Sequence, residues 1–105
     1  MESLCNSDSS ENIKEALTIL GDKWSALILK QLHQNPYRYS QFEQQLEGIS
    51  SRTLTKRLDM LLEKNVIKKT QIKDSAHHTY ELTKKGYDLD EVIHAMALWG
   101  KQHHS

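Results

Sequence analysis

The side chains best suited to molecular recognition are a group of hydroxyl and cationic residues in the segment 50–63. Ser51, Arg52, Thr55 and Lys56 have the spacing that places side chains on one face of a helix. The planar guanidinium of Arg52 can donate two hydrogen bonds to neighbouring acceptors on a guanine edge, and serine or threonine hydroxyls can bond to base edges as well. The segment therefore has the chemistry of a helix that reads bases in the major groove of double-stranded DNA.

A second, shorter helix is expected just before this segment, and the two are joined by a tight turn. Phe42 and Leu46 share one apolar face of the first helix, and Gly48 is expected to end it in the left-handed backbone conformation. Ser50 or Ser51 then caps the second helix with its hydroxyl. This is the layout of a helix-turn-helix, and the buried stripe of its second helix is expected to comprise Leu54, Leu58, Leu61 and Leu62.

An ordinary helical hairpin whose charges only face water would show the same pattern, so the distribution of charge has to discriminate. The net charge of the 105 residues is zero. Between positions 50 and 73, however, seven Lys and Arg side chains stand against two Asp and Glu. The positive charge therefore coincides with the candidate reading helix and the segment that follows it, as expected for a surface that contacts phosphates.

The order of the remaining elements predicts one domain that is mainly α with a small β-hairpin. A polar and flexible arm is expected over 1–11, and the domain over 12–105, with helices at 12–20 and from position 22 to about 33. After the helix-turn-helix, β-capable runs at 66–72 and 79–82 flank a polar loop, and a last helix follows Thr83. This order is that of a winged helix-turn-helix, in which a hairpin beside the reading helix tracks the DNA backbone or minor groove.

The expected DNA contacts follow from this arrangement. Base-edge and adjacent contacts are assigned to Ser51, Arg52, Thr55 and Lys56, with Arg52 as the guanine reader. Phosphate contacts are assigned to cations of the helix and the wing. The remaining DNA-facing residues are expected to be Ser50, Thr53, Arg57, Lys68, Lys69, Lys73 and His77.

Other classes of function have little support in the sequence. The chain has no nucleophile elbow, glycine-rich phosphate loop or HExxH pair, so no enzyme activity is expected. The adjacent histidine pairs at 77–78 and 103–104 lack the spaced partners of a zinc site, so neither a metal nor a cofactor is expected. No run approaches the roughly 20 apolar residues of a membrane span. A single cysteine fits a reducing cytoplasm.

Five separated motifs resemble the HxlR-type family of bacterial transcription regulators. They are ALTILGDKW at 16–24, YRY at 37–39, GISSRTLTKRL at 48–58, YELTKKG at 80–86 and WG at 99–100. The resemblance implies a homodimer, related in architecture to the MarR group, that binds operator DNA. Because a twofold protein presents two equivalent helices, its operator is expected to be an inverted repeat. It also implies that the first and last helices form the dimer interface, with the residues Ile13, Leu17, Leu89, Val92, Ile93, Met96 and Trp99.

The apolar surface of the last helix supports a dimer independently, because it exceeds what a small domain needs to cover one side. The alternative is that this helix folds back onto its own core. A winged-helix module that binds proteins and not DNA is the alternative for the whole chain, and the zero net charge is its main support. Salt-dependent affinity for a duplex discriminates between the two.

Cys5 is the candidate for sensing an effector. Many members of the resembled family carry a cysteine before the first helix, and in some of them it senses oxidants or electrophiles. Here extra polar residues at 6–11 separate Cys5 from the expected helix, the proline that commonly follows is absent, and the neighbours are neutral or acidic. Because a thiol becomes reactive near positive charge or a helix N-terminus, an inert thiol is the alternative. The effector is expected to be an oxidant or a small molecule.

Overall fold

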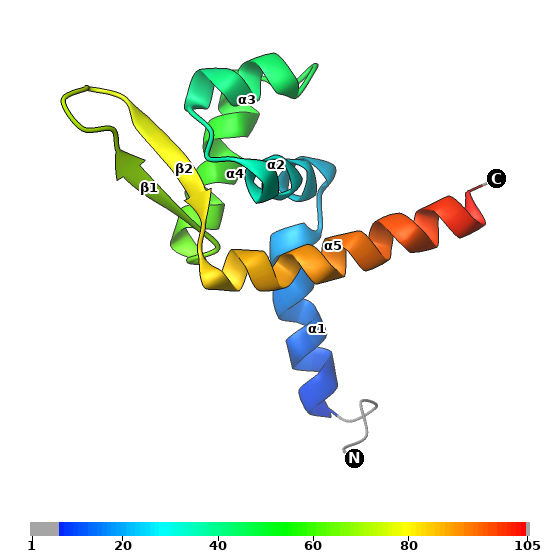
Figure 1. Cartoon of the computed structure of the whole chain (residues 1–105). Coiled ribbons are helices and arrows are strands. Elements are labelled where there is room, and N and C mark those ends of the chain that lie inside the picture. The colour runs from blue at the N-terminus through cyan, green and yellow to red at the C-terminus, as the bar shows by residue number, and fades with distance from the viewer. Residues whose placement is uncertain (1–6, 105) are drawn as a thin grey trace.

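The computed structural model describes residues 7–104 and confirms a mainly helical fold with one small β-hairpin. The hairpin follows the helix-turn-helix directly, as expected for a winged helix. The helix-turn-helix and the hairpin gather at one end of the molecule, and α1 and α5 extend from the other (Figure 1). The elements in chain order are α1 (Ser7–Leu20), α2 (Lys23–Gln34), α3 (Tyr39–Gln45), α4 (Ser51–Glu63), β1 (Ile67–Gln71), β2 (His78–Leu82) and α5 (Lys84–His103).

The first helix begins earlier than the apolar periodicity predicted. It starts at Ser7, five residues before the expected start at position 12, so part of the range 1–11 is helical. Periodicity could not show this, because the added residues are polar and carry no apolar stripe. Cys5 lies outside the described residues.

The core lies where α2, α4 and the hairpin meet. Phe42 and Leu46 of the α3 segment are buried in it as predicted, and Leu54, Leu58 and Leu61 of α4 are also buried. Leu62 was expected in the same stripe but is only partly buried. The other members of this core are Ile19, Leu20, Ile28, Leu29, Leu32, Val66, Ile67, Tyr80 and Leu82.

The turn between α3 and α4 has the predicted chemistry. Gly48 has a φ of 88°, in the left-handed region that glycine adopts without a steric cost. Ser50, one of the two predicted caps, is the residue that caps α4: its Oγ accepts from the Thr53 N–H at 3.0 Å. The start of α4 is therefore fixed.

The hairpin is antiparallel and is tied to the rest of the chain by one further bridge. Lys69 lies opposite Tyr80 and Lys68 opposite Glu81. Tyr37 extends the pairing, because its N–H donates to the Tyr80 carbonyl at 3.0 Å and its own carbonyl accepts from the Tyr80 N–H at 2.7 Å. The residues just before α3 are thus fixed to the wing.

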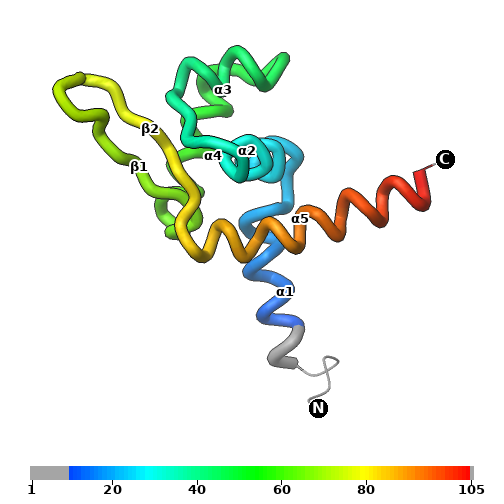
Figure 2. The backbone as a smooth tube through the Cα atoms, viewed as in Figure 1, coloured from blue at the N-terminus to red at the C-terminus, as the bar shows by residue number. Residues whose placement is uncertain are grey.

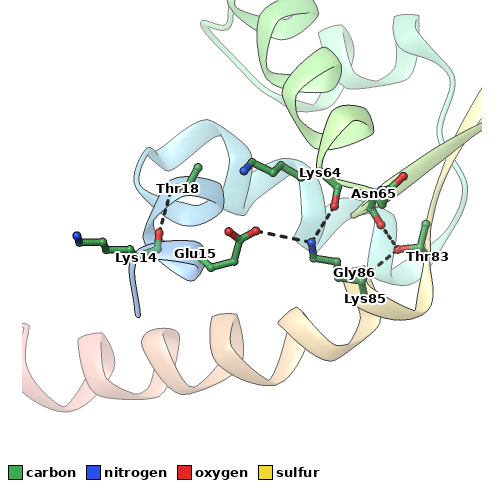
Figure 3. A network of polar contacts seen from close by, with 8 residues as sticks. All are labelled: Lys14, Glu15, Thr18, Lys64, Asn65, Thr83, Lys85 and Gly86. Carbon is green, nitrogen blue, oxygen red and sulfur yellow. Dashed lines mark hydrogen bonds and ion pairs between the residues drawn. The ribbon is translucent and has the colours of Figure 1, made fainter. Parts of the chain in front are cut away.

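A polar network joins the end of α4 to the beginning of α5 and to α1 (Figure 3). Asn65 ends α4 with a φ of 60°, as predicted for a left-handed terminus. The Thr83 hydroxyl donates to the Asn65 carbonyl at 2.6 Å and accepts from the Gly86 N–H at 3.2 Å. The Lys85 ammonium donates to the Lys64 carbonyl at 2.9 Å and lies 3.7 Å from the Glu15 carboxylate. Three helices are therefore held at one junction.

Gly86 is the tightest point of this junction, and we expect Gly86→Ala to lower the free energy of unfolding by about 1–3 kcal/mol. A Cβ at position 86 would lie 2.3 Å from the Val66 carbonyl oxygen, so α5 would have to move away from the turn after α4. Gly100→Ala is the matched control on the same helix, since its Cβ would meet no atom within 4 Å. Chemical denaturation measures both variants, and equal stabilities would contradict the close packing.

Candidate nucleic-acid interface

The outer face of α4 brings together the four side chains that were expected to read bases. Ser51, Arg52, Thr55 and Lys56 are all exposed, and they line a shallow hollow with Asp59 and other residues of the same face. The hydrophobic stripe of α4 faces the opposite way, into the core. The burial of that stripe fixes which side chains the helix presents to the outside.

Residues of α3 form hydrogen bonds with Ser51 and Thr55, whereas Arg52 and Lys56 are available to contact a ligand. The Tyr39 hydroxyl lies 3.1 Å from the Ser51 carbonyl and 3.0 Å from Thr55 Oγ1, and Ser51 Oγ donates to Glu43 at 3.2 Å. By contrast, Arg52 and Lys56 take part in none of the ion pairs found in the described part of the chain. Their cationic groups are therefore free to bind an external anion or base edge.

Arg57 occupies a different place from the one expected. Its Nη1 donates to Asp22 Oδ2 at 3.1 Å, and the two side chains are only 24% and 29% exposed. Asp22 also caps α2, because its carboxylate accepts from the Ser25 N–H at 2.9 Å and from the Ser25 hydroxyl at 2.8 Å. Arg57 thus joins the start of α2 to α4.

Helical spacing contained a signal for this inward position. Residue 57 lies three positions after Leu54 and four before Leu61, which places it on the edge of the buried stripe. Its partner could not be deduced from spacing, because Asp22 is 35 residues away in the chain.

From this contact we expect Arg57→Ala to destabilise the fold by about 1–3 kcal/mol, since it removes a charged hydrogen bond and leaves Asp22 partly buried without that partner. The salt dependence of DNA binding should stay unchanged, because the side chain points to Asp22. Urea denaturation and binding titrations at several salt concentrations measure the two properties. A shallower salt dependence with unchanged stability would instead restore the phosphate contact that the sequence suggested.

The wing separates the lysines that were expected to contact phosphates. Because Lys68 and Lys69 are consecutive in a strand, they lie on opposite faces of the hairpin. Lys69 shares a face with Tyr80, whose ring centroid is 5.7 Å from its ammonium, and it lines a pocket with His77. Lys68 lies across from Glu81 on the other face, and Lys73 is exposed in the loop.

Comparisons with known proteins decide the family. The model of the HxlR-like helix-turn-helix family matches residues 19–105. The chain belongs to this HxlR-like family. The match includes α2 to α5 and only the end of α1.

Relatives of this HxlR-like chain are described as regulators. It is 33% identical over 94 residues to an uncharacterized HTH-type transcriptional regulator of Mycobacterium tuberculosis, covering 89% of this chain and 59% of that protein. It is 31% identical to the uncharacterized HTH-type transcriptional regulator YvaP of Bacillus subtilis, covering 91% and 90%. The reduced form of the transcriptional regulator YodB from B. subtilis superposes with a TM-score of 0.81 at 26% identity, covering 90% of this chain and 93% of that one. The chain thus spans about three fifths of the length of the mycobacterial relative.

The apolar residues that were expected at a dimer interface fall into two groups in this HxlR-like fold. Leu89 and Ile93 are partly buried against the chain's own core. The others are exposed, with Ile13 at 58%, Leu17 at 60% and Trp99 at 66%. The exposed members of the set are Ile13, Leu17, Val92, Met96 and Trp99.

These exposed residues belong to the two helices that extend from the molecule. The last part of α5 runs beyond the other helices, and α1 crosses its first half (Figure 2). The core of the domain therefore buries one side of α5. The exposed apolar side chains of α1 and α5 are not covered by any of the described residues. Among residues 7–104, no helix is both long enough and apolar enough to cross a lipid bilayer.

Proposed function

We propose that the protein is a sequence-specific DNA-binding transcription regulator that acts as a homodimer on an inverted-repeat operator. The observation that carries the proposal is the exposure of Arg52 and Lys56, without an ion pair among residues 7–104, on a helix whose start, buried face and neighbours are all fixed. A preorganised helix loses little freedom when it enters the major groove. The family's description as HxlR-like helix-turn-helix supports the same assignment.

The homodimer is proposed from the exposed apolar residues of α1 and α5. Large side chains such as Leu17 and Trp99 are more than half exposed, and a second copy of the chain offers an equally apolar face. In a twofold interface, the same patch of each subunit contacts that of the other, so each residue contributes to the interface twice. The two reading helices of such a dimer face two half-sites of opposite direction.

The effector is proposed to be an oxidant or a small molecule. The resemblance to the HxlR-type family makes Cys5 the candidate thiol, and this part of the proposal rests on that resemblance alone. A small molecule has a groove available between α1 and α5. Its lining residues are the apolar Ala16, Ile19, Leu89 and Val92 and the polar Asn12, Glu15, Lys85 and Asp88. Because the groove adjoins the proposed interface, a ligand in it would alter how the two subunits meet. We expect the regulator to act in the cytoplasm.

Selection of duplexes from a random pool by the purified protein tests the proposal, because it does not require a known operator. The expected result is enrichment of an inverted repeat whose half-sites are separated by about 10 base pairs or a multiple of that. Enrichment of no sequence would contradict a sequence-specific regulator and would favour a protein-binding module.

A further inference from the structure

A pocket between α3 and the wing has the composition of an anion site. It is lined by Arg38, Tyr39, Ser40, Lys69, His77 and Tyr80, together with the small Ala76 and the half-buried His78. The bridge between Tyr37 and Tyr80 joins its two sides through hydrogen bonds of 3.0 Å and 2.7 Å. These backbone hydrogen bonds therefore fix the position of the α3 side of the pocket relative to β2.

The charge around this pocket is of one sign. Arg38 and Lys69 supply two permanent cations, and no Asp or Glu is among the lining residues. Neither cation takes part in an ion pair within the part of the chain that the structure describes. Glu81, the acid of the adjacent strand, lies across from Lys68 on the other face of the hairpin. Two cations without a carboxylate between them favour an anionic ligand.

The pocket directly adjoins the front of the reading helix. Tyr39 forms part of its wall, and the hydroxyl of the same residue contacts the Ser51 carbonyl and the Thr55 hydroxyl in the first turns of α4. On the other side, the ammonium of Lys69 lies over the ring of Tyr80. A ligand in the pocket would thus lie between the reading helix and the wing.

We propose that this pocket binds one phosphate of the DNA backbone, with Arg38 as its principal ligand and Lys69 as the second cation. This inference rests on the proposed function, because the phosphate is that of the bound duplex. The guanidinium fork can donate two parallel hydrogen bonds to phosphate oxygens, and Ser40, which also lines the pocket, has a hydroxyl that can donate a further one. A phosphate held here fixes the register of α4 in the groove without reading sequence.

The three arginines of the chain then have three separate roles. Arg52 is exposed on the reading face, Arg57 is paired with Asp22 inside the domain, and Arg38 lines the phosphate pocket. Each role changes a different observable when the residue is replaced, namely base preference, stability and salt dependence. The assignment of Arg38 is therefore separable from the other two.

Arg38→Gln tests the proposal, with Lys101→Gln as a control that removes one exposed charge at the far end of α5. For each half-site bound, the expected result for Arg38→Gln is a loss of affinity of roughly five- to tenfold at 0.1 M salt, equal for all sequences, and a salt slope shallower by about one unit. Lys101→Gln should leave both unchanged. Arg38→Lys keeps the charge without the fork, so its affinity should be intermediate while the slope is kept. A thermal melt confirms that each variant is folded.

Duplexes with a single neutral methylphosphonate identify the contact itself. The wild-type protein should lose affinity when one backbone position of each half-site is neutralised. Arg38→Gln should lose much less at that position, because only Lys69 still faces that phosphate, and should respond like the wild-type protein at all other positions. Unchanged affinity of Arg38→Gln, or a loss that depends on sequence, would overturn the phosphate pocket and leave the proposed function intact. Competition by inorganic phosphate at constant ionic strength would instead assign the pocket to the free ion. Failure of the wild-type protein to bind any duplex would overturn the proposed function itself.

Discussion

Arg52→Ala is expected to weaken operator binding by about 1–3 kcal/mol for each half-site and to relax the preference at one base pair. The side chain is exposed, has no ion-pair partner in the described residues, and projects from a helix that Ser50 caps. We expect its loss to remove the two hydrogen bonds that the guanidinium donates to a guanine edge in the proposed complex. Fluorescence anisotropy with duplexes that differ by one base pair measures both the affinity and the preference.

Arg52→Lys is the matched variant for this prediction. The lysine keeps the positive charge but cannot form the two parallel hydrogen bonds of a guanidinium. We expect it to retain affinity for unrelated sequences and to lose most of the discrimination at the same base pair. If both variants lose affinity evenly across all duplexes, Arg52 contacts phosphate and the base reader lies elsewhere on α4.

Trp99→Ala is expected to raise the dimer dissociation constant by about a thousandfold. The indole is 66% exposed, so its truncation should not disturb the folding of the monomer. Buried tryptophan side chains commonly contribute about 2 kcal/mol or more to an interface, and the twofold axis counts that loss twice. Affinity for the inverted repeat should fall as well, because a monomer engages only one half-site. Analytical ultracentrifugation over a range of concentrations measures the dimer constant directly.

Tyr87→Ala is the control for the dimer prediction. Tyr87 is also a half-exposed aromatic residue on α5, and it contacts His33 of the same chain edge to face, with 6.0 Å between ring centroids. It does not belong to the expected interface, so its truncation should leave the dimer constant unchanged. A monomeric wild-type protein, or equal effects of both variants, would contradict the interface on α1 and α5.

Local chemistry explains which parts of the fold were predictable. Gly48, Ser50 and Asn65 each meet a backbone requirement that few other residues satisfy, so the ends of α3 and α4 could be located from residue type. The spacing of the apolar residues in α4 identified its outer face, because the apolar stripe has to lie in the core. The start of α1 was missed because its first residues are polar and carry no periodic signal.

The functional surface was less predictable, because its decisive contacts join distant parts of the chain. Arg57 was expected at DNA, but its ion pair with Asp22 depends on how α2 packs against α4. The period of two in a strand could have shown that Lys68 and Lys69 face opposite ways. No sequence pattern marked Arg38 as a candidate anion ligand, because it lies beside the wing through the bridge between Tyr37 and Tyr80.

The salt dependence of duplex binding tests the DNA-binding function most directly. The protein is titrated against a labelled duplex from the region upstream of its own gene, at several salt concentrations. We expect the logarithm of the binding constant to fall linearly with the logarithm of salt concentration, with a slope of about −0.9 for each phosphate contact. Binding that is absent at low salt, or that does not change with salt, would contradict the DNA-binding function.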